Sequence, residues 1–175
     1  MQTHHSSTLS WLLCIFSTLL FPLEIIAKST DGDLPMNIEA DKVILKEKKG
    51  ISRYLGKVAI TQGSRKISGD NITIYSNDTE VTKVVIKGKP ASFSQLNDND
   101  EKIEASSHSM VFHAKTEILV LETNAVLQQK DNIFRSDKIT YNTAKDIITA
   151  GKKNGVENER VKITILPQKD NDTTQ

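Results

Sequence analysis

Short runs of alternating apolar and polar residues recur along most of the chain. The clearest of these runs lie at residues 72–75, 110–113 and 161–165. Alternation with a period of two, rich in Val, Ile and Thr, is typical of strands that bury one face. After residue 27 the sequence contains no convincing apolar pattern with the spacing of a helix. The pattern therefore predicts an all-β domain.

Polar clusters separate these runs, at residues 46–50, 76–80, 97–100, 130–132 and 151–155. Such clusters indicate turns, because Gly and Asn tolerate a positive φ. Candidate strands then recur about every 8–12 residues, a spacing typical of sandwiches, jelly rolls and barrels. The apolar positions are odd-numbered before Gly56-Lys57, at Ile51 and Leu55, and even-numbered after it, at Val58 and Ile60. This change of parity leads us to expect a tight hairpin there.

The chain also resembles itself at an offset of 67 residues. Identical pairs at this offset are Ile51 and Ile118, Gln62 and Gln129, Asp70 and Asp137, Ile72 and Ile139, Thr73 and Thr140, and Gly88 and Gly155. Apolar character also matches, as for Val43 with Met110 and Leu45 with Phe112, and Gly56-Lys57 aligns with Thr123-Asn124. One unit of several strands is therefore used twice. Stacked units share a core and leave open ends, whereas the alternative is duplication within one closed sandwich.

The front of the chain is its most apolar segment, at residues 9–23. Because a membrane span needs about 20 apolar residues, this segment suits the core of an export signal better. We predict a signal peptide at 1–27 cleaved after Ala27, a domain at 28–167 and a disordered polar tail at 168–175. An uncleaved anchor and an internal apolar segment are the alternatives.

Composition narrows the possible functions. The chain has 23 Lys and Arg against 22 Asp and Glu, which argues against a charge-driven nucleic-acid binder. Only 5% of residues are aromatic, so platforms for stacking sugars or bases are scarce. Apolar residues make up 37%, mostly aliphatic, which suits either an ordinary core or an interior that holds an apolar ligand.

We find no catalytic or metal-binding constellation, so the sequence predicts a protein that is not an enzyme and has no cofactor or metal. His108 and His113 are five residues apart and would face opposite sides of one continuous strand. Asp70 and Asp137 occupy equivalent repeat positions, where we expect carboxylates that accept backbone N–H bonds at turns. A pair of glycosidase carboxylates is the alternative for them.

Seven segments of the chain form an ordered set, at 35–41, 56–63, 67–70, 88–93, 125–129, 136–141 and 160–167. Together they resemble the OstA-like domain family, the periplasmic lipopolysaccharide transport proteins of Gram-negative bacteria. The resemblance implies a twisted antiparallel β-jelly roll, open at both ends, that joins head to tail. It also implies a bridge from LptC at the inner-membrane ABC transporter to the outer-membrane LptD–LptE translocon. In such a bridge the lipid A part of lipopolysaccharide travels in an apolar groove, without catalysis or a cofactor.

Site residues follow from this picture as hypotheses. We expect the groove to be lined by Met36, Ile38, Leu45, Phe93, Met110 and Phe112, although plain core packing is an equal alternative for each. The end strands would form the edges between protomers, with Met36, Ile38, Val161, Ile163 and Ile165. An unpaired edge strand can add a strand from another chain, and a head-to-tail contact that does not close gives a filament.

Two other function classes remain open from the sequence. The first is a non-catalytic envelope scaffold or a membrane-anchored, LptC-like partner, which would keep residues 1–27. The second is an enzyme acting on envelope glycans through Asp70 and Asp137. Mature N-terminal sequencing and an Asp70→Asn variant separate these from a carrier.

Overall fold

The computed structural model describes residues 31–78, 80–151 and 160–166. The predicted signal peptide at 1–27 and the predicted tail at 168–175 lie outside these residues. In the described ranges no helix is long and apolar enough to cross a membrane.

The described residues form ten strands and two short 3-10 turns, which confirms the all-β prediction. The strands are longer than the alternating runs suggested, reaching 17 residues in β5. The elements are η1 (Asp31–Asp33), β1 (Asn37–Glu39), β2 (Lys42–Lys46), η2 (Glu47–Lys49), β3 (Ile51–Gln62), β4 (Arg65–Asn77), β5 (Glu80–Leu96), β6 (Lys102–His113), β7 (Ile118–Gln129), β8 (Asn132–Asn142), β9 (Ile147–Gly151) and β10 (Lys162–Ile165).

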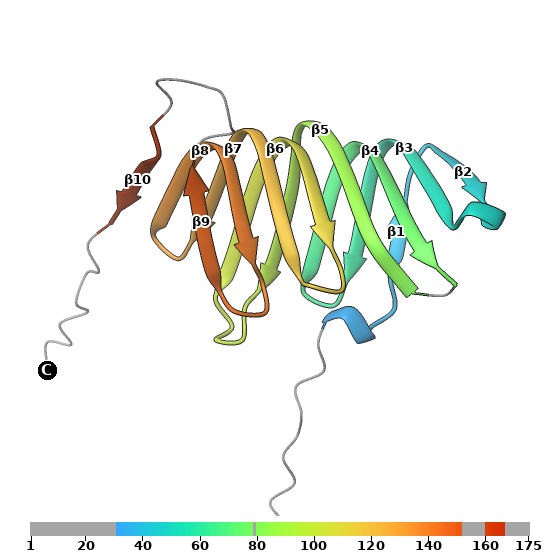
Figure 1. Ribbon diagram of the computed structural model, residues 1–175, viewed down its shortest axis with the longest axis horizontal. Helices are drawn as coiled ribbons and strands as arrows, with labels where there is room; N and C mark the ends of the chain where they lie inside the picture. Colours follow the sequence, from blue (N-terminus) through green and yellow to red (C-terminus); the bar gives the residue numbers. More distant parts are fainter. Residues whose placement is uncertain (1–30, 79, 152–159, 167–175) are drawn as a thin grey trace, which may run out of the picture.

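All strands belong to one open antiparallel sheet. Strands β3 to β8 follow in chain order, with β1 and β2 both on the outer edge of β3 and β9 and β10 both on the outer edge of β8. Figure 1 shows the strands side by side along the long axis, with β2 near one end and β10 at the other. The open arrangement of two repeated units is thus confirmed. The repeat is visible in the strand bounds, because β3 and β7 begin and end 67 residues apart.

A row of register shifts crosses the sheet. Each neighbouring pair from β3–β4 to β7–β8 shifts register near its middle, for example between Leu55 and Val58 and between Glu122 and Ala125. Bulges of this kind bend strands. The sheet therefore folds over along the row into two layers, with strand turns along the lower edge in Figure 1. We call residues 58–68, 91–107 and 125–136, with β1 and β10, the first layer. The second layer is residues 51–55, 71–87, 109–122 and 138–151, with β2.

The predicted hairpin at Gly56-Lys57 is wrong, because β3 runs through it without reversing. Gly56 and Lys57 have φ values of 76° and 42°, and the repeat counterparts Thr123 and Asn124 have 67° and 55°. These residues form the bulge, which changes side-chain parity within one strand. At Gly56 an added Cβ would lie 2.3 Å from a carboxylate oxygen of Asp41, so glycine is required where the β1–β2 junction packs.

The core lies between the two layers. Its fully buried apolar side chains come from both, including Val58, Phe93 and Leu127 from the first layer and Ile86, Met110 and Tyr141 from the second. Phe93 and Phe112, from opposite layers, meet with ring centroids 6.4 Å apart. The layers therefore share one apolar interior, and their turn-bearing edges define its mouth.

Candidate binding groove

A cavity of about 640 Å³ opens between the layers in the N-terminal half of the sheet. Apolar side chains line much of its wall: Met36, Ile60, Ile67, Val84 and Phe112. Charged side chains from four different segments also line it: Asp33, Arg65, Glu80, Lys115 and Glu117. An apolar concavity of this volume with a few polar groups is typical of a ligand site. It suits a molecule with apolar chains and a polar head.

The segment before β1, residues 31–36, lies across one side of this cavity, and we call it the N-terminal cap. Gln62 at the end of β3 donates from Nε2 to the carbonyls of Gly32 and Leu34, at 3.1 and 3.0 Å. The Asp31 carboxylate accepts from the backbone N and the Oγ of Ser64, at 2.8 and 2.6 Å. The cap is therefore fixed to the first layer by the β3–β4 turn.

Arg65 connects the two layers beside the cap. Its guanidinium carbon lies 4.7 Å from the ring centroid of Phe112, across the interior. It donates to the side-chain oxygens of Gln95 and Gln62, at 3.4 and 3.5 Å. Burial lowers the pKa of Arg65, and the nearby carboxylates of Asp31 and Glu117 oppose that shift. The cation thus lies between these polar groups and the ring of Phe112, where it can orient an anionic ligand group.

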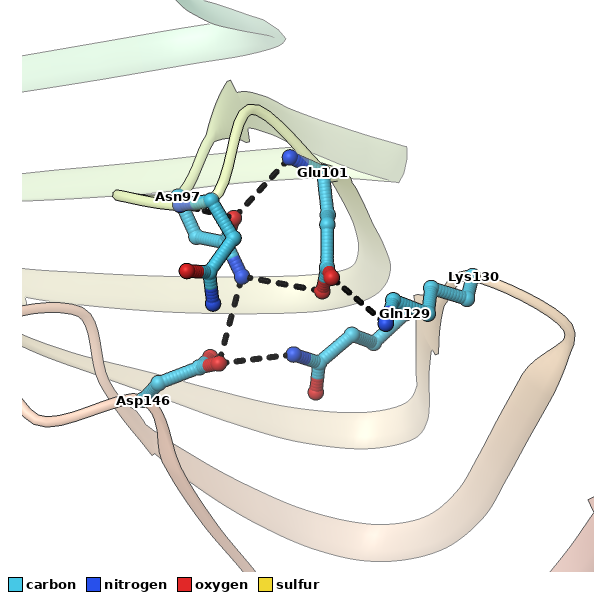
Figure 2. Close-up of polar contacts among 6 residues, drawn as sticks. Asn97, Glu101, Gln129, Lys130 and Asp146 are labelled. Atoms are coloured by element: carbon cyan, nitrogen blue, oxygen red, sulfur yellow. Dashed lines mark hydrogen bonds and ion pairs between the residues drawn. The ribbon is translucent and has the colours of Figure 1, made fainter.

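A different contact closes the mouth in the C-terminal half. The Asp146 carboxylate, in the β8–β9 turn of the second layer, accepts from Asn97 Nδ2 at 3.2 Å and Gln129 Nε2 at 2.8 Å, both in the first layer. It also accepts from the Tyr141 hydroxyl at 2.9 Å. We call these four residues the Asp146 latch; Figure 2 shows its cross-layer part. Burial and the bond to Asp146 raise the pKa of Tyr141, so its hydroxyl stays a donor.

The latch is held in place by its surroundings. Asn97 is buried, and its Oδ1 accepts the backbone N–H groups of Asn99 and Glu101 at 3.0 and 2.9 Å. Glu101 in turn forms an ion pair with Lys130, as Figure 2 shows. Behind the latch, Ile103, Leu119, Leu127 and Ile139 fill the interior with no exposed surface. Among the described residues the interior of the C-terminal half is thus filled by side chains, whereas the N-terminal half has a cavity.

The structure brings most of the predicted groove residues into the interior. Met36 and Phe112 line the cavity, and Ile38 packs against the core from β1. Phe93 and Met110 are fully buried. Leu45 is not brought together with them: it is 56% exposed on β2, at the end of the second layer. The sequence alone does not reveal the roles of Arg65 and Asp146. Gln62 and Gln129 are visible in the sequence as identical residues at the repeat offset, but the groups to which their side chains hydrogen-bond are not.

The predicted edge residues lie at the two ends of the sheet. Among the residues that the structure describes, β1 pairs with β3 alone and β10 with β8 alone. Ile163 and Ile165 are 54% and 73% exposed, and Val161 just before β10 is also exposed. These apolar side chains therefore face solvent in the single chain.

The turn positions predicted for Asp70 and Asp137 are wrong. Both lie inside long strands, β4 and β8, beside the row of bulges. Three strands separate β4 from β8, so at about 4.8 Å per strand the two carboxylates are too far apart for a glycosidase pair.

The opposite-face prediction for His108 and His113 is also wrong. The register of β6 shifts between Ser106 and Ser109, so both histidines lie on exposed positions of that strand. In the described part of the chain no group of three or more His, Cys, Asp or Glu side chains could hold a metal ion.

Comparisons with known proteins agree with this geometry. The family model described as LptA/(LptD N-terminal domain) LPS transport protein matches residues 37–147. The lipopolysaccharide export system protein LptA of Escherichia coli (strain K12) is 35% identical over 139 residues, covering 78% of this chain and 75% of that protein. The lipopolysaccharide export system protein LptH of Pseudomonas aeruginosa is 30% identical over 150 residues, covering 82% and 86%.

A solved structure and a larger protein extend the comparison. The crystal structure of LptH, the LptA-homologous periplasmic component of the lipopolysaccharide transport device of P. aeruginosa, has a TM-score of 0.74 at 28% identity. It covers 79% of this chain and 100% of that one. The LPS-assembly protein LptD of Vibrio cholerae is 30% identical over 92 residues, covering 52% of this chain and 10% of LptD. The chain therefore belongs to the LptA/LptD N-terminal domain family of lipopolysaccharide transport proteins.

Proposed function

We propose that this chain is a non-enzymatic periplasmic carrier of lipopolysaccharide. It holds the lipid A part in the groove between its two layers and passes it from the inner toward the outer membrane. The observation that carries the proposal is the apolar cavity of about 640 Å³ between the layers of an open-ended sheet. Family membership supports it, since LptA and LptH are both named as lipopolysaccharide export system proteins.

Burial in this groove keeps the acyl chains out of water, which stabilises them by about 0.8 kcal/mol per CH₂ group relative to chains exposed in the periplasm. Met36 and Phe112 line the cavity and are the first contacts. Phe93 and Met110 are fully buried and Ile38 is partly buried on β1, so the layers must separate to admit lipid to these residues. Leu45 belongs to the groove only when a second chain extends it. The sugars stay in solvent, beyond the charged side chains at the mouth.

Transport across the periplasm requires partners at both ends. We infer that copies of the chain join head to tail through their sheet edges. LptC on the inner-membrane side and LptD–LptE on the outer-membrane side take the terminal positions. The match to part of V. cholerae LptD supports this, because a domain of the same family can present the same kind of edge.

A photo-crosslinking experiment tests the carrier function. A photoreactive phenylalanine analogue replaces Phe112 or Met36 in living cells, which are irradiated and probed for lipopolysaccharide. Lys138 is the control, because it lies on β8 in an ion pair with Glu122, away from the cavity. We expect adducts at Phe112 and Met36 and none at Lys138. A folded, exported protein without adducts at either groove position would contradict the proposal and favour a scaffold.

Export itself is the second part of the test. We expect the mature protein in the periplasmic fraction, beginning at Lys28 after cleavage behind Ala27. N-terminal sequencing checks this prediction. A mature protein that begins at Met1 and fractionates with the inner membrane would instead indicate an anchored, LptC-like protein.

A further inference from the structure

The two layers carry different side chains on their outer faces, which point away from the shared interior. Alternate residues of a strand point to opposite faces, so the buried positions determine the outward ones. Val84 and Ile86 are buried in the second layer, which turns Val85 outward between them. The strand pairings continue this outward row across the sheet as Arg53, Thr73, Val85, Val111, Val120 and Thr140. The centre of this outer face is therefore apolar and β-branched.

The outer face of the first layer is different. Ile67 and Phe93 are buried there, so Ser68 and Ser92 point outward, and their hydroxyl oxygens lie 2.7 Å apart in a hydrogen bond. The corresponding outward row is Ala59, Ser68, Ser92, Ser106 and Val126. Small and hydroxyl side chains thus replace the β-branched apolar row of the second layer.

Basic side chains surround the apolar row of the second layer. We call the outward positions of that layer the basic face. Among its paired, described residues the charged side chains are Lys42, Lys46, Arg53, Lys83, Lys87 and Lys138 with one carboxylate, Glu122. The whole chain carries a net charge of only +1, so the rest of it is acidic on balance. The charge of the molecule is therefore segregated onto this face.

The basic side chains are spread over the face and do not converge on one point. Lys83 and Lys87 are four residues apart on β5, which is about 13 Å. Arg53 on β3 and Lys138 on β8 lie two and three strands from β5, about 10 and 14 Å away. One phosphate or carboxylate could reach one or two of these cations at most. The whole face matches a surface that carries many separate anions.

A leaflet of anionic phospholipid is a surface of that kind. Basic side chains near it are attracted by its negative potential, and exposed apolar patches rimmed by polar groups mark membrane contacts. Lys83 lies over the ring of Tyr75, with its ammonium 4.2 Å from the ring centroid, so an aromatic side chain also belongs to the face. Aromatic rings with a polar tip favour the headgroup level of a membrane.

We propose that the basic face docks this chain on the surface of an anionic phospholipid membrane. The contact is electrostatic, with the row centred on Val111 toward the headgroups. It goes beyond the carrier function proposed above, because lipid A would occupy the inner side of the second layer and docking uses its outer side. Neither of the two functions requires the other.

Vesicle co-sedimentation of the purified mature chain tests the docking. Vesicles of phosphatidylcholine are compared with vesicles in which about one lipid in three is phosphatidylglycerol. We expect binding to the anionic vesicles alone, and we expect it to weaken as NaCl is raised from about 0.05 to 0.5 M, because salt screens the attraction. Absence of binding to the anionic vesicles, or equal binding to the neutral ones, would overturn the proposal.

Two double variants with the same change in net charge identify the face. Each basic residue near an anionic surface strengthens binding about fivefold, so Lys83→Gln with Lys87→Gln should weaken binding about 25-fold. The matched control is Lys66→Gln with Lys102→Gln, because both lysines point outward from the first layer. We expect the control to change binding by less than about twofold. An equal loss in both variants would mean that net charge, and not this face, attracts the membrane.

A fluorescent label reports the orientation without changing a charged residue. Val111 and Ser106 lie on the same strand, β6, are both half-buried and point outward from opposite layers. Val111→Cys and Ser106→Cys are each combined with Cys14→Ser, which leaves one cysteine for an environment-sensitive dye. Anionic vesicles should brighten the dye at Val111 and leave it unchanged at Ser106. Brightening at Ser106, or at both positions alike, would contradict docking through the basic face.

Two further readouts separate this proposal from its neighbours. A soluble, phosphorylated core oligosaccharide freed of lipid should leave the dye at Val111 unchanged. An equal response to that sugar would overturn the membrane assignment in favour of the sugars of lipopolysaccharide. The lipopolysaccharide crosslink at Phe112 should persist in the Lys83→Gln, Lys87→Gln variant. Loss of that crosslink in the original chain, with vesicle binding intact, would contradict the carrier function and leave docking standing.

Discussion

The N-terminal and C-terminal halves of the sheet have the same strand arrangement, but different contacts close the interior along the edge that carries the turns. Gln62 and Gln129 are repeat counterparts at the ends of β3 and β7. Gln62 binds backbone carbonyls of the N-terminal cap, and Gln129 binds the Asp146 carboxylate of the opposite layer. The first half contains a cavity of about 640 Å³, and the interior of the second is filled. The repeated strands therefore form the groove, whereas the turns, which are not repeated, determine whether the groove is accessible.

A second comparison concerns the middle and the end of the sheet. Leu45 and Phe112 hold the same repeat position, yet Leu45 is 56% exposed and Phe112 is 4% exposed. Phe112 has neighbouring strands on both sides and Arg65 and Phe93 across the interior. Leu45 lies on an edge strand that, within the described part of the chain, pairs with β3 alone. Its exposure therefore reflects its place in the sheet and not its local sequence.

Alanine substitution at these two counterparts should give the largest contrast. We expect Phe112→Ala to lower the free energy of unfolding by about 3–5 kcal/mol, because it leaves a void between the layers. Leu45→Ala in the isolated chain should lower it by less than about 0.5 kcal/mol, as for an exposed site. Urea unfolding of both variants checks this. Similar losses for the two would show that β2 is covered in the isolated chain.

The Asp146 latch should give the next largest effect. Asp146→Ala removes the acceptor for three hydrogen bonds and leaves the buried Asn97 and Tyr141 without it. We expect a loss of about 2–3 kcal/mol in the free energy of unfolding. Amide exchange should speed up in the β8–β9 and β5–β6 turns. Glu104→Ala, which breaks an exposed ion pair within β6, is the matched control.

An unchanged exchange rate in the turns of Asp146→Ala would mean that packing alone closes the C-terminal half. Faster exchange in the control variant as well would mean that the turns respond to any loss of charge.

Substitution of the counterparts Gln62 and Gln129 should show that access to the interior can change without a difference in stability. Gln62→Ala and Gln129→Ala should each cost about 1 kcal/mol of unfolding free energy, a typical value for lost side-chain hydrogen bonds. Only Gln62→Ala frees the cap beside the existing cavity, so only this variant should bind a fluorescent apolar probe faster. Stopped-flow mixing with N-phenylnaphthylamine measures the rate. Equal acceleration in both variants would mean that the two mouths open alike.

Much of this fold was predictable because its signals are local. The alternation of apolar and polar residues at 72–75 indicates a strand. The identical residues Gln62 and Gln129, 67 positions apart, indicate the repeat. The bulge at Gly56-Lys57 has the same sequence signal as a hairpin, because both structures use positive φ and both change which alternate positions are apolar. The Asp146 latch depends on which turns meet when the sheet folds over. Nothing local in the sequence encodes that meeting.

The smallest effect concerns the ion pair that supports the latch. The hydrogen bond from Lys130 lowers the pKa of Glu101, and the same contact raises the pKa of Lys130. A lowered carboxyl pKa means that this contribution to stability is present above the ordinary Glu value and is lost as the pH falls through the lowered pKa. The free energy of unfolding should therefore decline less steeply below pH about 4.5 in Lys130→Gln than in the original chain.

Lys138→Gln is the control for that measurement, because its ion pair with Glu122 joins β8 to β7 in the second layer, away from the β5–β6 turn. Amide exchange in the β5–β6 turn, followed over the same pH range, shows whether the lost stability is local. In the original chain amide exchange in this turn should accelerate as the pH falls through the lowered pKa of Glu101, whereas in Lys130→Gln it should depend less on pH. The same pH dependence in both chains would mean that the Glu101–Lys130 pair does not hold this turn.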